Sequence, residues 1–522
     1  SSSTSNSAMA AMLVLSKEDS PSRQKSVHSI TATGVFSAQK YQYDRLYGAS
    51  KDLSFNSLWY NLNGGAIESL SSNFSQWTMM SYVGRINYGL MDRYLLTASL
   101  RYDGSSRLSE GNKWAFFPSA AIAWRITEED FAKNLDWLSN LKLRFSYGQA
   151  GNTNSVSPYA SEGTISGSVY YPFGTSTSVG NLPANIANPM LTWERTSEYN
   201  VGLDFGFLNQ RISGNIEYYN RTTNDLLMKR NIPVHLGYSS VTSNVGSVRN
   251  SGFELQLNTA NIVTKNFAWN TTINLAYNKN EIVSLADEED LSNYSIHLKG
   301  MRGRYSDKRF IGKPVDTNWT QNTIGVWQLG EEEEAAKYGC VPGNFKIKDY
   351  NNDGKLTDDD YIIDGKRTPD WTGGMTNMFK IYDFDFSFHM YFQAGATQYD
   401  RFFENFALEW NSQNFNNLRT NYWTPENPSN TMGRPSQMGS RGNIAYERTD
   451  FLKVSYITLG YTLNKRLMSK WGLDNARIYV TVQNPFILTK FRGLDPEQPD
   501  LTNIGDTDGM TMNALLGVNI SF

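Results

Sequence analysis

Acidic and amide side chains alternate through residues 349–360, which read DYNNDGKLTDDD. A calcium loop of the EF-hand type takes side-chain oxygens at its first, third and fifth positions, glycine at the sixth, a backbone carbonyl at the seventh and a carboxylate at the twelfth. Gly354 stands at the sixth position. The spacing predicts a Ca²⁺ site whose ligands are Asp349, Asn351, Asp353, the carbonyl of Lys355, and Asp360.

Asp360 departs from this template, which has glutamate at the twelfth position. The shorter carboxylate binds from one side and weakens the affinity, so we expect the site to fill at extracellular calcium concentrations. Long helices do not flank the segment, so we expect a structural role that stiffens the loop rather than a calcium switch. A solvated turn rich in Asn, Asp and Gly is the alternative interpretation.

Other residues that could carry chemistry are scattered. Cys340 is the single cysteine, which excludes a disulfide within the chain. The run from Glu331 to Glu334 is typical of a solvated loop face. The histidines are too far apart to predict a zinc site; they are His28, His235, His297 and His389. The sequence has no nucleophile elbow, phosphate-binding loop or dinucleotide fingerprint, so we predict that the protein is not an enzyme.

The composition favours strands as the elements that position the loop. The 522 residues include 30 Tyr, 27 Phe, 13 Trp and 41 Gly, as expected for alternating strands with aromatic girdles and Gly-rich turns. A soluble sandwich or propeller shares this composition. The 48 basic and 51 acidic residues nearly cancel, which argues against a nucleic-acid partner. No apolar run approaches the roughly 18 residues that a transmembrane helix needs, so a membrane would be crossed by a barrel.

Apolar and polar side chains alternate with a period of two in many segments. In the last residues, one face of an extended chain carries Ala514, Leu516, Val518, Ile520 and Phe522. Such a strand suits the end of an outer-membrane barrel, whose apolar face meets lipid and whose polar face lines the lumen. We count roughly fourteen strands, many about ten residues long, which is the length of a tilted membrane-spanning strand.

Short and long connections alternate along the chain. The short ones lie at 91–92, 208–210, 261–265, 382–383 and 464–475. The long ones cover 151–190, 221–248, 281–370, 394–448 and 485–510. Small periplasmic turns and large outer loops give a barrel this parity, whereas a sandwich has no reason for it. We therefore predict an all-β fold, a transmembrane antiparallel β-barrel with long extracellular loops.

The predicted organisation has three parts. Residues 1–26 form an N-terminal segment with one early strand, within 9–15, followed by a loop. Residues 27–522 form the barrel, with a loop rich in Ser, Asn and Tyr at 40–76. Residues 281–370 form a large extracellular insertion that contains the predicted calcium loop, 349–360.

Short motifs lie on the predicted strands and turns. They read YVGRINY at 82–88, YLLTASLRYDGSS at 94–106, WAFFPS at 114–119, NSGFE at 250–254, GGMTN at 373–377, QNP at 483–485 and GLDPE at 493–497. Together they resemble the SusC/RagA-like TonB-dependent transporters, and the resemblance extends from about residue 27 to residue 522.

The resemblance implies a 22-stranded barrel that is occluded by an N-terminal plug and capped by a SusD-like surface lipoprotein. It also implies TonB-energised import of a glycan or peptide across the outer membrane of a Gram-negative, Bacteroidetes-like bacterium. The sequence opens on Ser1 without a signal peptide, a plug, a TonB-contacting segment or the early strands, and is expected to be the C-terminal part of the barrel. Since an open sheet edge cannot face lipid, we expect the missing strands and plug to come from another chain or from a part of the protein outside this sequence.

Two other functions stay open: a surface-exposed β-rich binding protein or adhesin, and, less favoured, an outer-membrane enzyme. Aromatic rings in the predicted outer loops could stack on sugars or anchor a peptide. Packing within the loops, or contact with a lipoprotein, explains them equally well, so no substrate-binding residue is assigned. These aromatic residues are Tyr159, Tyr170, Tyr171, Trp319, Trp327, Trp410 and Trp423.

Overall fold

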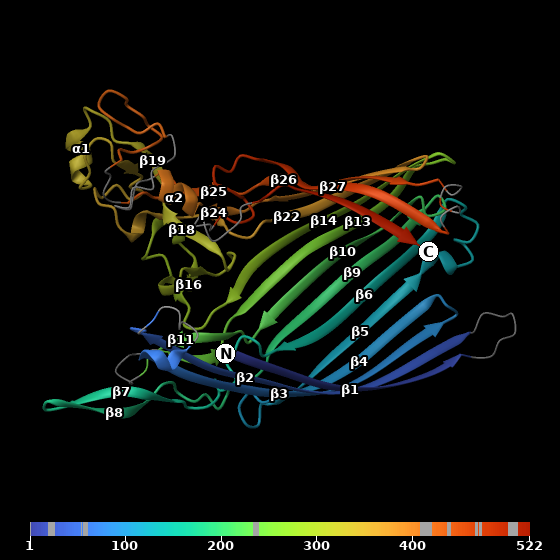
Figure 1. The fold of residues 1–522 in the computed structure, drawn as a ribbon, viewed down its shortest axis with the longest axis horizontal. Coiled ribbons are helices and arrows are strands. Elements are labelled where there is room, and N and C mark those ends of the chain that lie inside the picture. The colour runs from blue at the N-terminus through green and yellow to red at the C-terminus, as the bar shows by residue number, and fades with distance from the viewer. Residues whose placement is uncertain are drawn as a thin grey trace. The chain divides into compact units, whose positions relative to one another are not determined.

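A large antiparallel sheet dominates the computed structural model, which describes residues 2–18, 27–53, 55, 61–232, 238, 240–407, 420–435, 440–464, 468, 472–499 and 510–521. Its fifteen strands follow one another in chain order (Figure 1). They are β1 (Ser2–Glu18), β2 (His28–Lys51), β3 (Ala66–Leu90), β4 (Tyr94–Ser105), β5 (Trp114–Arg125), β6 (Leu138–Asn152), β9 (Glu194–Phe207), β10 (Ile212–Asn224), β13 (Ser247–Val263), β14 (Phe267–Ser284), β22 (Trp371–Ile381), β23 (Phe384–Ala394), β26 (Phe451–Thr462), β27 (Asn475–Thr489) and β28 (Asn513–Ser521).

The long connections contain small sheets and two short helices. Their strands are β7 (Ile165–Phe173), β8 (Ser176–Pro183), β11 (Leu227–Asn231), β12 (Ser240–Asn244), β15 (Glu289–Asp290), β16 (Arg302–Arg304), β17 (Arg309–Phe310), β18 (Thr317–Gln321), β19 (Thr323–Val326), β20 (Phe345–Ile347), β21 (Tyr361–Lys366), β24 (Thr397–Tyr399) and β25 (Tyr446–Arg448). The helices are α1 (Glu332–Lys337) and α2 (Arg401–Ala407). Among the described residues, no helix has both the length and the apolar character needed to cross a bilayer.

The predicted parity of the connections is confirmed. Tight turns join β3 to β4, β9 to β10 and β22 to β23, while long segments join β6 to β9, β14 to β22 and β23 to β26. Met91 and Asp92 in the first of these turns have φ angles of 51° and 56°, the left-handed geometry that closes a tight hairpin between twisted strands. The turn keeps β3 and β4 in unbroken register, so paired side chains of the two strands lie on the same face of the sheet.

The chain divides into two compact units. Unit 1 comprises Ser1–Phe131, Lys142–Val201 and Arg221–Ser247, and unit 2 comprises Ala132–Leu141, Gly202–Asn220 and Val248–Phe522.

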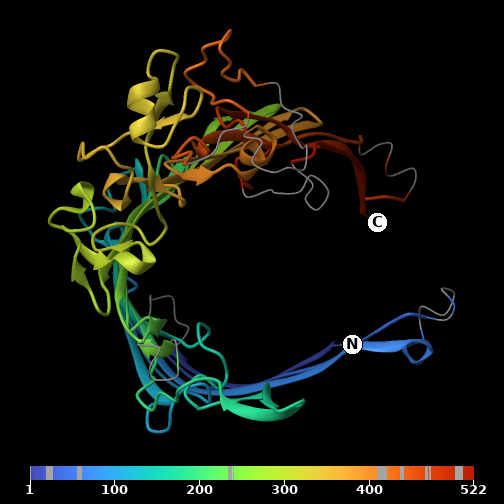
Figure 2. The same cartoon turned by 90° about the vertical axis from the view of Figure 1, so that its left-hand side faces the viewer.

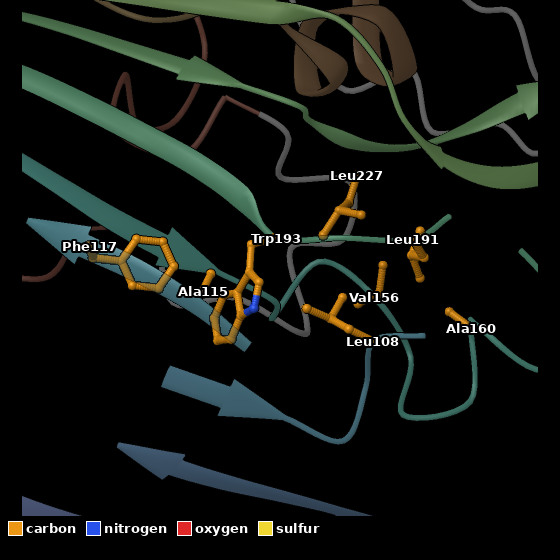
Figure 3. Close-up of a cluster of buried hydrophobic side chains, with 8 residues drawn as sticks. All are labelled: Leu108, Ala115, Phe117, Val156, Ala160, Leu191, Trp193 and Leu227. Carbon is orange, nitrogen blue, oxygen red and sulfur yellow. The ribbon is translucent and has the colours of Figure 1, made fainter. Parts of the chain in front are cut away.

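The core of unit 1 lies where its connections pack on the end of β5. Trp193 is 1% exposed, meets Phe117 edge to face at 5.3 Å and donates its indole N–H to the carbonyl of Lys113 at 3.0 Å. Figure 3 shows these rings with the aliphatic side chains around them. The complete cluster is Leu108, Ala115, Phe117, Val156, Ala160, Leu191, Trp193 and Leu227. Loops that are far apart in sequence are thus fixed to the sheet by one apolar cluster.

In unit 2, two long connections fold together into a lobe, which we define as residues 285–370, 395–407, 420–435 and 440–450. The amide of Val326 donates to Asn430 Oδ1 at 2.9 Å, and the indole of Trp423 donates to Gln328 Oε1 at 2.9 Å. A shared cluster joins them: Val326, Phe345, Phe403, Ala407, Trp423, Met432 and Ala445. The lobe lies at one end of the strands of unit 2 (Figure 1) and faces the viewer in Figure 2. The predicted insertion is therefore a folded element rather than an open loop.

The predicted loop at 40–76 is wrong. β2 continues to Lys51 and β3 starts at Ala66, and the two strands stay paired from His28↔Leu90 to Lys51↔Ala66. The apolar–polar alternation fades in the outer part of this pair, where Gln42 pairs with Gln76. The hairpin pairing therefore persists beyond the region in which one face must be apolar, and periodicity alone misses it.

At the two ends of the chain, the sequence predictions can be compared only in part. The strand expected within 9–15 is part of β1, which pairs with β2 from Ser2↔Arg45 to Glu18↔Ser29. The predicted C-terminal strand is confirmed as β28, which ends at Ser521. Phe522 lies outside the described residues.

Two acids in the described part of the lobe, Asp360 and Asp400, are fully buried. Asp400 is 0% exposed, and its Oδ1 accepts the amide N–H of Phe403 at 2.9 Å at the start of α2. Its Oδ2 has no hydrogen-bond partner among the described residues. Burial raises the pKa of Asp400 to about 6, with the Glu447 carboxylate acting in the same direction and Arg492 opposing it.

Trp193→Ala should destabilise the protein by about 3–5 kcal/mol, because it opens a cavity in the core and removes the hydrogen bond from the indole to the carbonyl of Lys113. The measurement is the denaturant midpoint at which the heat-modifiable folded form is lost on a gel. Phe116→Leu, an exposed change on β5 next to Phe117, is the control and should leave the midpoint nearly unchanged. Equal effects of the two substitutions would contradict the assigned core.

Asp400 should make the lobe less stable as the pH rises. Because its pKa of about 6 exceeds the usual value near 4, the stabilising contribution is complete below about pH 4 and is lost as the pH passes through about 6, by at most about 3 kcal/mol. Hydrogen exchange of residues 397–407 should be slower at pH 5 than at pH 8, after correction for the intrinsic rate. Asp400→Asn keeps an acceptor for Phe403 and should remove this dependence; an unchanged profile in the variant would rule out Asp400 as its source.

Candidate functional site

The strands of unit 1 have one apolar and one polar face. On β4, Leu96, Ala98 and Leu100 point to the first face, and Thr97, Ser99 and Arg101 to the second. Cross-strand register extends both faces, since Leu100 opposes Gly84 on β3 and Pro118 on β5. Leu100 is 48% exposed, so the apolar face is not covered by other parts of unit 1. A sheet with one uncovered apolar face suits a wall against hydrocarbon.

Aromatic rings mark two levels on this apolar face. The first level lies away from the tight turn at Met91, with ring centroids 4.3–6.1 Å apart; its members are Phe36, Tyr82, Tyr102, Trp114 and Phe116. The second lies near that turn and consists of His28, Tyr88, Tyr94 and Trp124. From Phe116 to Trp124 the strand needs nine residues, counted inclusively, which fits the roughly 9–11 residues of a membrane-spanning strand. Two such levels are the aromatic girdles of a membrane barrel.

Unit 2 repeats the pattern. Tyr277 and Trp371 pack at 4.9 Å at one level, and Trp269 and Phe379 stack at 5.6 Å at the other. Asn377 lies on β22 between the two levels and is a polar residue on the apolar face, but it is only 5% exposed. Its Oδ1 accepts the indole N–H of Trp269 at 2.9 Å and the hydroxyl of Thr271 at 2.7 Å. The side-chain amide oxygen of Asn377, the last residue of the GGMTN motif, is therefore hydrogen-bonded within the protein and not left unpaired toward lipid.

The polar face carries paired charges and hydroxyls. In unit 1, Arg101 bonds Asp103 at 2.6 Å and Ser81 at 3.1 Å. In unit 2, Asp385 on β23 pairs with Arg477 on β27 at 2.8 Å, across the intervening β26. Gly460 on β26 makes this possible, because a Cβ there would lie 2.5 Å from both the Asp385 carboxylate and the Arg477 guanidinium. This ion pair joins residues far apart in sequence and was not predicted; a lone glycine within a predicted strand was its only signal.

The predicted calcium loop forms a compact turn. Asp349 Oδ1 accepts the amide of Asn352 at 2.6 Å, and its Oδ2 accepts the amide of Gly354 at 2.9 Å and the hydroxyl of Tyr338 at 3.1 Å. Burial raises the pKa of Asp349, but the two backbone N–H donors outweigh it and hold the pKa below its usual value. Gly354 has a φ of +78°, which confirms the sharp turn expected at this position.

The other predicted ligands lie on the same turn and at its end. Asn351 Nδ2 donates to Asp353 Oδ2 at 3.2 Å, and Asp353 Oδ1 accepts the amide of Lys355 at 2.8 Å. Asp360 is fully buried, with one oxygen accepting the amide of Tyr350 at 2.8 Å and the other that of Thr357 at 2.9 Å. It therefore fastens the two ends of the loop together.

Within the described part of the chain, no three His, Cys, Asp or Glu side chains are grouped so that they could hold a metal ion. The carboxylates of the loop are directed at backbone amides, although each oxygen has a second lone pair. The sequence prediction of Ca²⁺ at this loop thus stays a prediction.

The outer-loop aromatics fall into two groups. Trp327 and Trp423 are buried in the lobe, 3% and 6% exposed, with Trp327 stacked on Tyr338 and Trp423 in the shared cluster. Trp319 packs against a second cluster around Phe310. The exposed residues are Tyr159, Tyr170 and Tyr171, the last two on β7. Trp410 and His235 lie outside the described residues. Packing is therefore the role of the buried tryptophans, one of the two explanations that the sequence left open.

The scattered residues have structural surroundings. Glu331 bonds Lys346 at 2.9 Å, and Glu332 to Glu334 are exposed on α1, as predicted for a solvated run. Cys340 is a free thiol whose pKa is raised by burial. His297 meets the Tyr350 ring edge to face at 4.2 Å, and His389 bonds Thr376 at 2.9 Å.

Comparison with known proteins agrees with this geometry. The family model described as "TonB dependent receptor-like, beta-barrel" matches residues 15–372. TonB-dependent receptor P26 of Formosa agariphila is 33% identical over 518 residues, covering 95% of this chain and 51% of the relative. TonB-dependent receptor SusC of Bacteroides thetaiotaomicron is 35% identical over 457 residues, covering 85% of this chain and 44% of the relative.

A solved structure shows the same fold. The structure titled "Structure of the RagAB peptide transporter" superposes with a TM-score of 0.81 at 23% identity, covering 100% of this chain and 56% of that one. The chain thus spans about half the length of the relatives it matches. Its uncovered apolar face, two aromatic levels and polar inner face are those of a membrane barrel. The chain belongs to the TonB-dependent receptor β-barrel family and is an outer-membrane protein.

Proposed function

We propose that the protein forms the translocation wall of a TonB-energised nutrient importer. The two-faced sheet is the observation that carries this proposal: its apolar face suits lipid, and its polar face, with ion pairs such as Asp385–Arg477, suits a hydrated or protein-filled lumen. The resemblance of the chain to SusC, at 35% identity, supports an importer rather than an adhesin or an enzyme.

The substrate in this proposal is a glycan or peptide, delivered by a SusD-like surface lipoprotein. The lobe at the end of the unit 2 strands offers a broad, folded rim, since both of its connections share one apolar core. A rim that is already folded binds a lipoprotein lid without a cost for ordering loops, whereas separate open loops would have to be ordered on contact. The exposed rings of Tyr170 and Tyr171 lie on another long connection, the one between β6 and β9 in unit 1.

The remaining barrel strands and the plug complete the importer in this proposal. The sheet order begins at β1 and ends at β28. A strand edge in hydrocarbon would leave backbone N–H and C=O groups unpaired at a cost of several kcal/mol each, so further strands must pair with these edges. Either another part of the same protein or a second chain supplies them, and TonB acts through the plug.

The function is tested by uptake. Cells that make the protein with its lipoprotein partner should accumulate fluorescent glycans or peptides too large for diffusion pores. Accumulation should fall to the background of cells lacking the protein when TonB is deleted or the proton gradient is collapsed, because opening then has no energy source. Surface binding that persists without uptake would instead indicate an adhesin, and uptake independent of TonB would refute energised import.

We also propose that Ca²⁺ stiffens the loop at 349–360, with Asp349, Asn351, Asp353, the carbonyl of Lys355 and Asp360 as ligands. The support is the spacing of the oxygen donors and the turn at Gly354, which suit a weak extracellular site. Binding requires the carboxylates to turn from the backbone amides toward the ion.

Calcium binding should appear in the 10⁻⁴–10⁻³ M range typical of extracellular sites. Calorimetric titration of the purified protein should give a dissociation constant that Asp349→Asn weakens about tenfold, or about 1.4 kcal/mol, since a charged ligand is lost. Asp359→Asn removes the same charge within the loop but no proposed ligand, so it should bind as the wild type does. No heat of binding, or equal weakening by both substitutions, would contradict the site.

A further inference from the structure

Two glycines on the apolar face of unit 1 leave open space that no described side chain fills. Gly34 on β2 and Gly84 on β3 face each other in register. A Cβ at either position would meet no atom within 4 Å, and neither residue has a positive φ. Elsewhere a strand glycine makes room for a neighbour, as Gly460 does for the Asp385–Arg477 pair. Neither backbone conformation nor internal packing therefore requires glycine here, and glycine within a strand otherwise marks close approach by a ligand.

The two glycines form the floor of a groove. Leu13 opposes Gly34, and Leu100 opposes Gly84, so leucines form the walls on both sides. Two adjoining hollows of about 610 and 650 Å³ share this floor. Their lining on the apolar face consists of Leu13, Leu15, Ala32, Gly34, Phe36, Tyr82, Gly84, Ile86, Ala98, Leu100, Tyr102 and Pro118. The groove crosses β1 to β5, which are neighbours in the sheet (Figure 1).

Hydrocarbon is the medium that this groove faces. It lies between the two aromatic levels, on a face whose Leu13 and Leu100 side chains are 63% and 48% exposed. An empty hollow there would forfeit dispersion contacts along its lining, and apart from Tyr82 and Tyr102 the side chains that line it on that face are apolar. The groove extends from Tyr82 to Ile86, four residue steps along β3, or about 13 Å. A flexible apolar chain fits a trough of this length and lining.

The level of the groove selects one leaflet. The groove borders Tyr82 and Tyr102 of the aromatic level that lies away from the tight turn at Met91. Because the long loops of outer-membrane barrels are extracellular, this level belongs to the outer leaflet. Lys40 is exposed on the same face of β2, beyond Phe36 and Ala38, where a cation attracts anionic headgroups.

We propose that the groove floored by Gly34 and Gly84 holds an acyl chain of lipid A, the phosphorylated glycolipid of the outer leaflet, with Lys40 near its phosphate. The bound lipid seals the surface of β1 to β4 and is retained longer than the surrounding lipid, because the shape of the groove fits one chain.

Filling the groove tests the proposal. Gly34→Leu/Gly84→Leu should reduce the lipid A that stays with the detergent-purified full-length protein about tenfold, or about 1.4 kcal/mol, as measured by mass spectrometry per mole of protein. Phospholipid in the same samples should be unchanged. Ala514→Leu adds the same side chain on the apolar face of β28 and should retain wild-type lipid A. Lys40→Gln should lower lipid A retention without changing phospholipid.

A second measurement does not depend on filling the groove. A photo-crosslinking side chain at Leu100 should form adducts with lipid A, whereas the same side chain at Leu516, exposed on β28, should label lipids without preference. Equal lipid A in all variants, or no lipid A adduct at position 100, would overturn the proposal. Selective loss of phospholipid, or adducts with a second copy of the chain or another membrane protein, would overturn the choice of occupant.

Discussion

The fold depends on one constraint: a backbone that passes through hydrocarbon must pair every N–H and C=O within the protein. Antiparallel neighbours in chain order meet this requirement with the shortest possible connections, as at Met91 and Tyr382, where left-handed residues close tight turns. Once the backbone is paired, the two-residue period assigns each side chain to lipid or to the interior. The same rule explains Asn377, whose amide oxygen on the lipid side is occupied by Trp269 and Thr271.

Much of the sheet could be predicted from the sequence because this constraint leaves a regular pattern. The alternation at Leu96, Ala98 and Leu100 indicated a spanning strand, and the parity of the connections separated a barrel from a sandwich. The error at 40–76 has the same origin. Beyond the membrane, strands β2 and β3 remain paired but no longer need an apolar face, so the period that identifies a strand is lost while the strand continues.

The candidate sites were less accessible to sequence reasoning. The turn at Gly354 was visible because it depends on neighbouring residues, and the structure places Asp349, Asn351 and Asp353 on that turn. The Asp385–Arg477 pair depends on three strands coming together over Gly460, and the burial of Trp327 and Trp423 depends on two distant connections. Such contacts are set by tertiary packing, which leaves no periodic trace in a single sequence.

The shared core of the lobe has a consequence for how such proteins diversify. Phe345 and Trp423 come from different connections but are buried in the same cluster, so neither segment can form this cluster alone. Exchange of one segment between related genes would leave the other with exposed rings and unmatched acceptors. Changes to this cluster in one segment must therefore be matched by changes in the other, although β22 and β23 separate the two segments in the sequence.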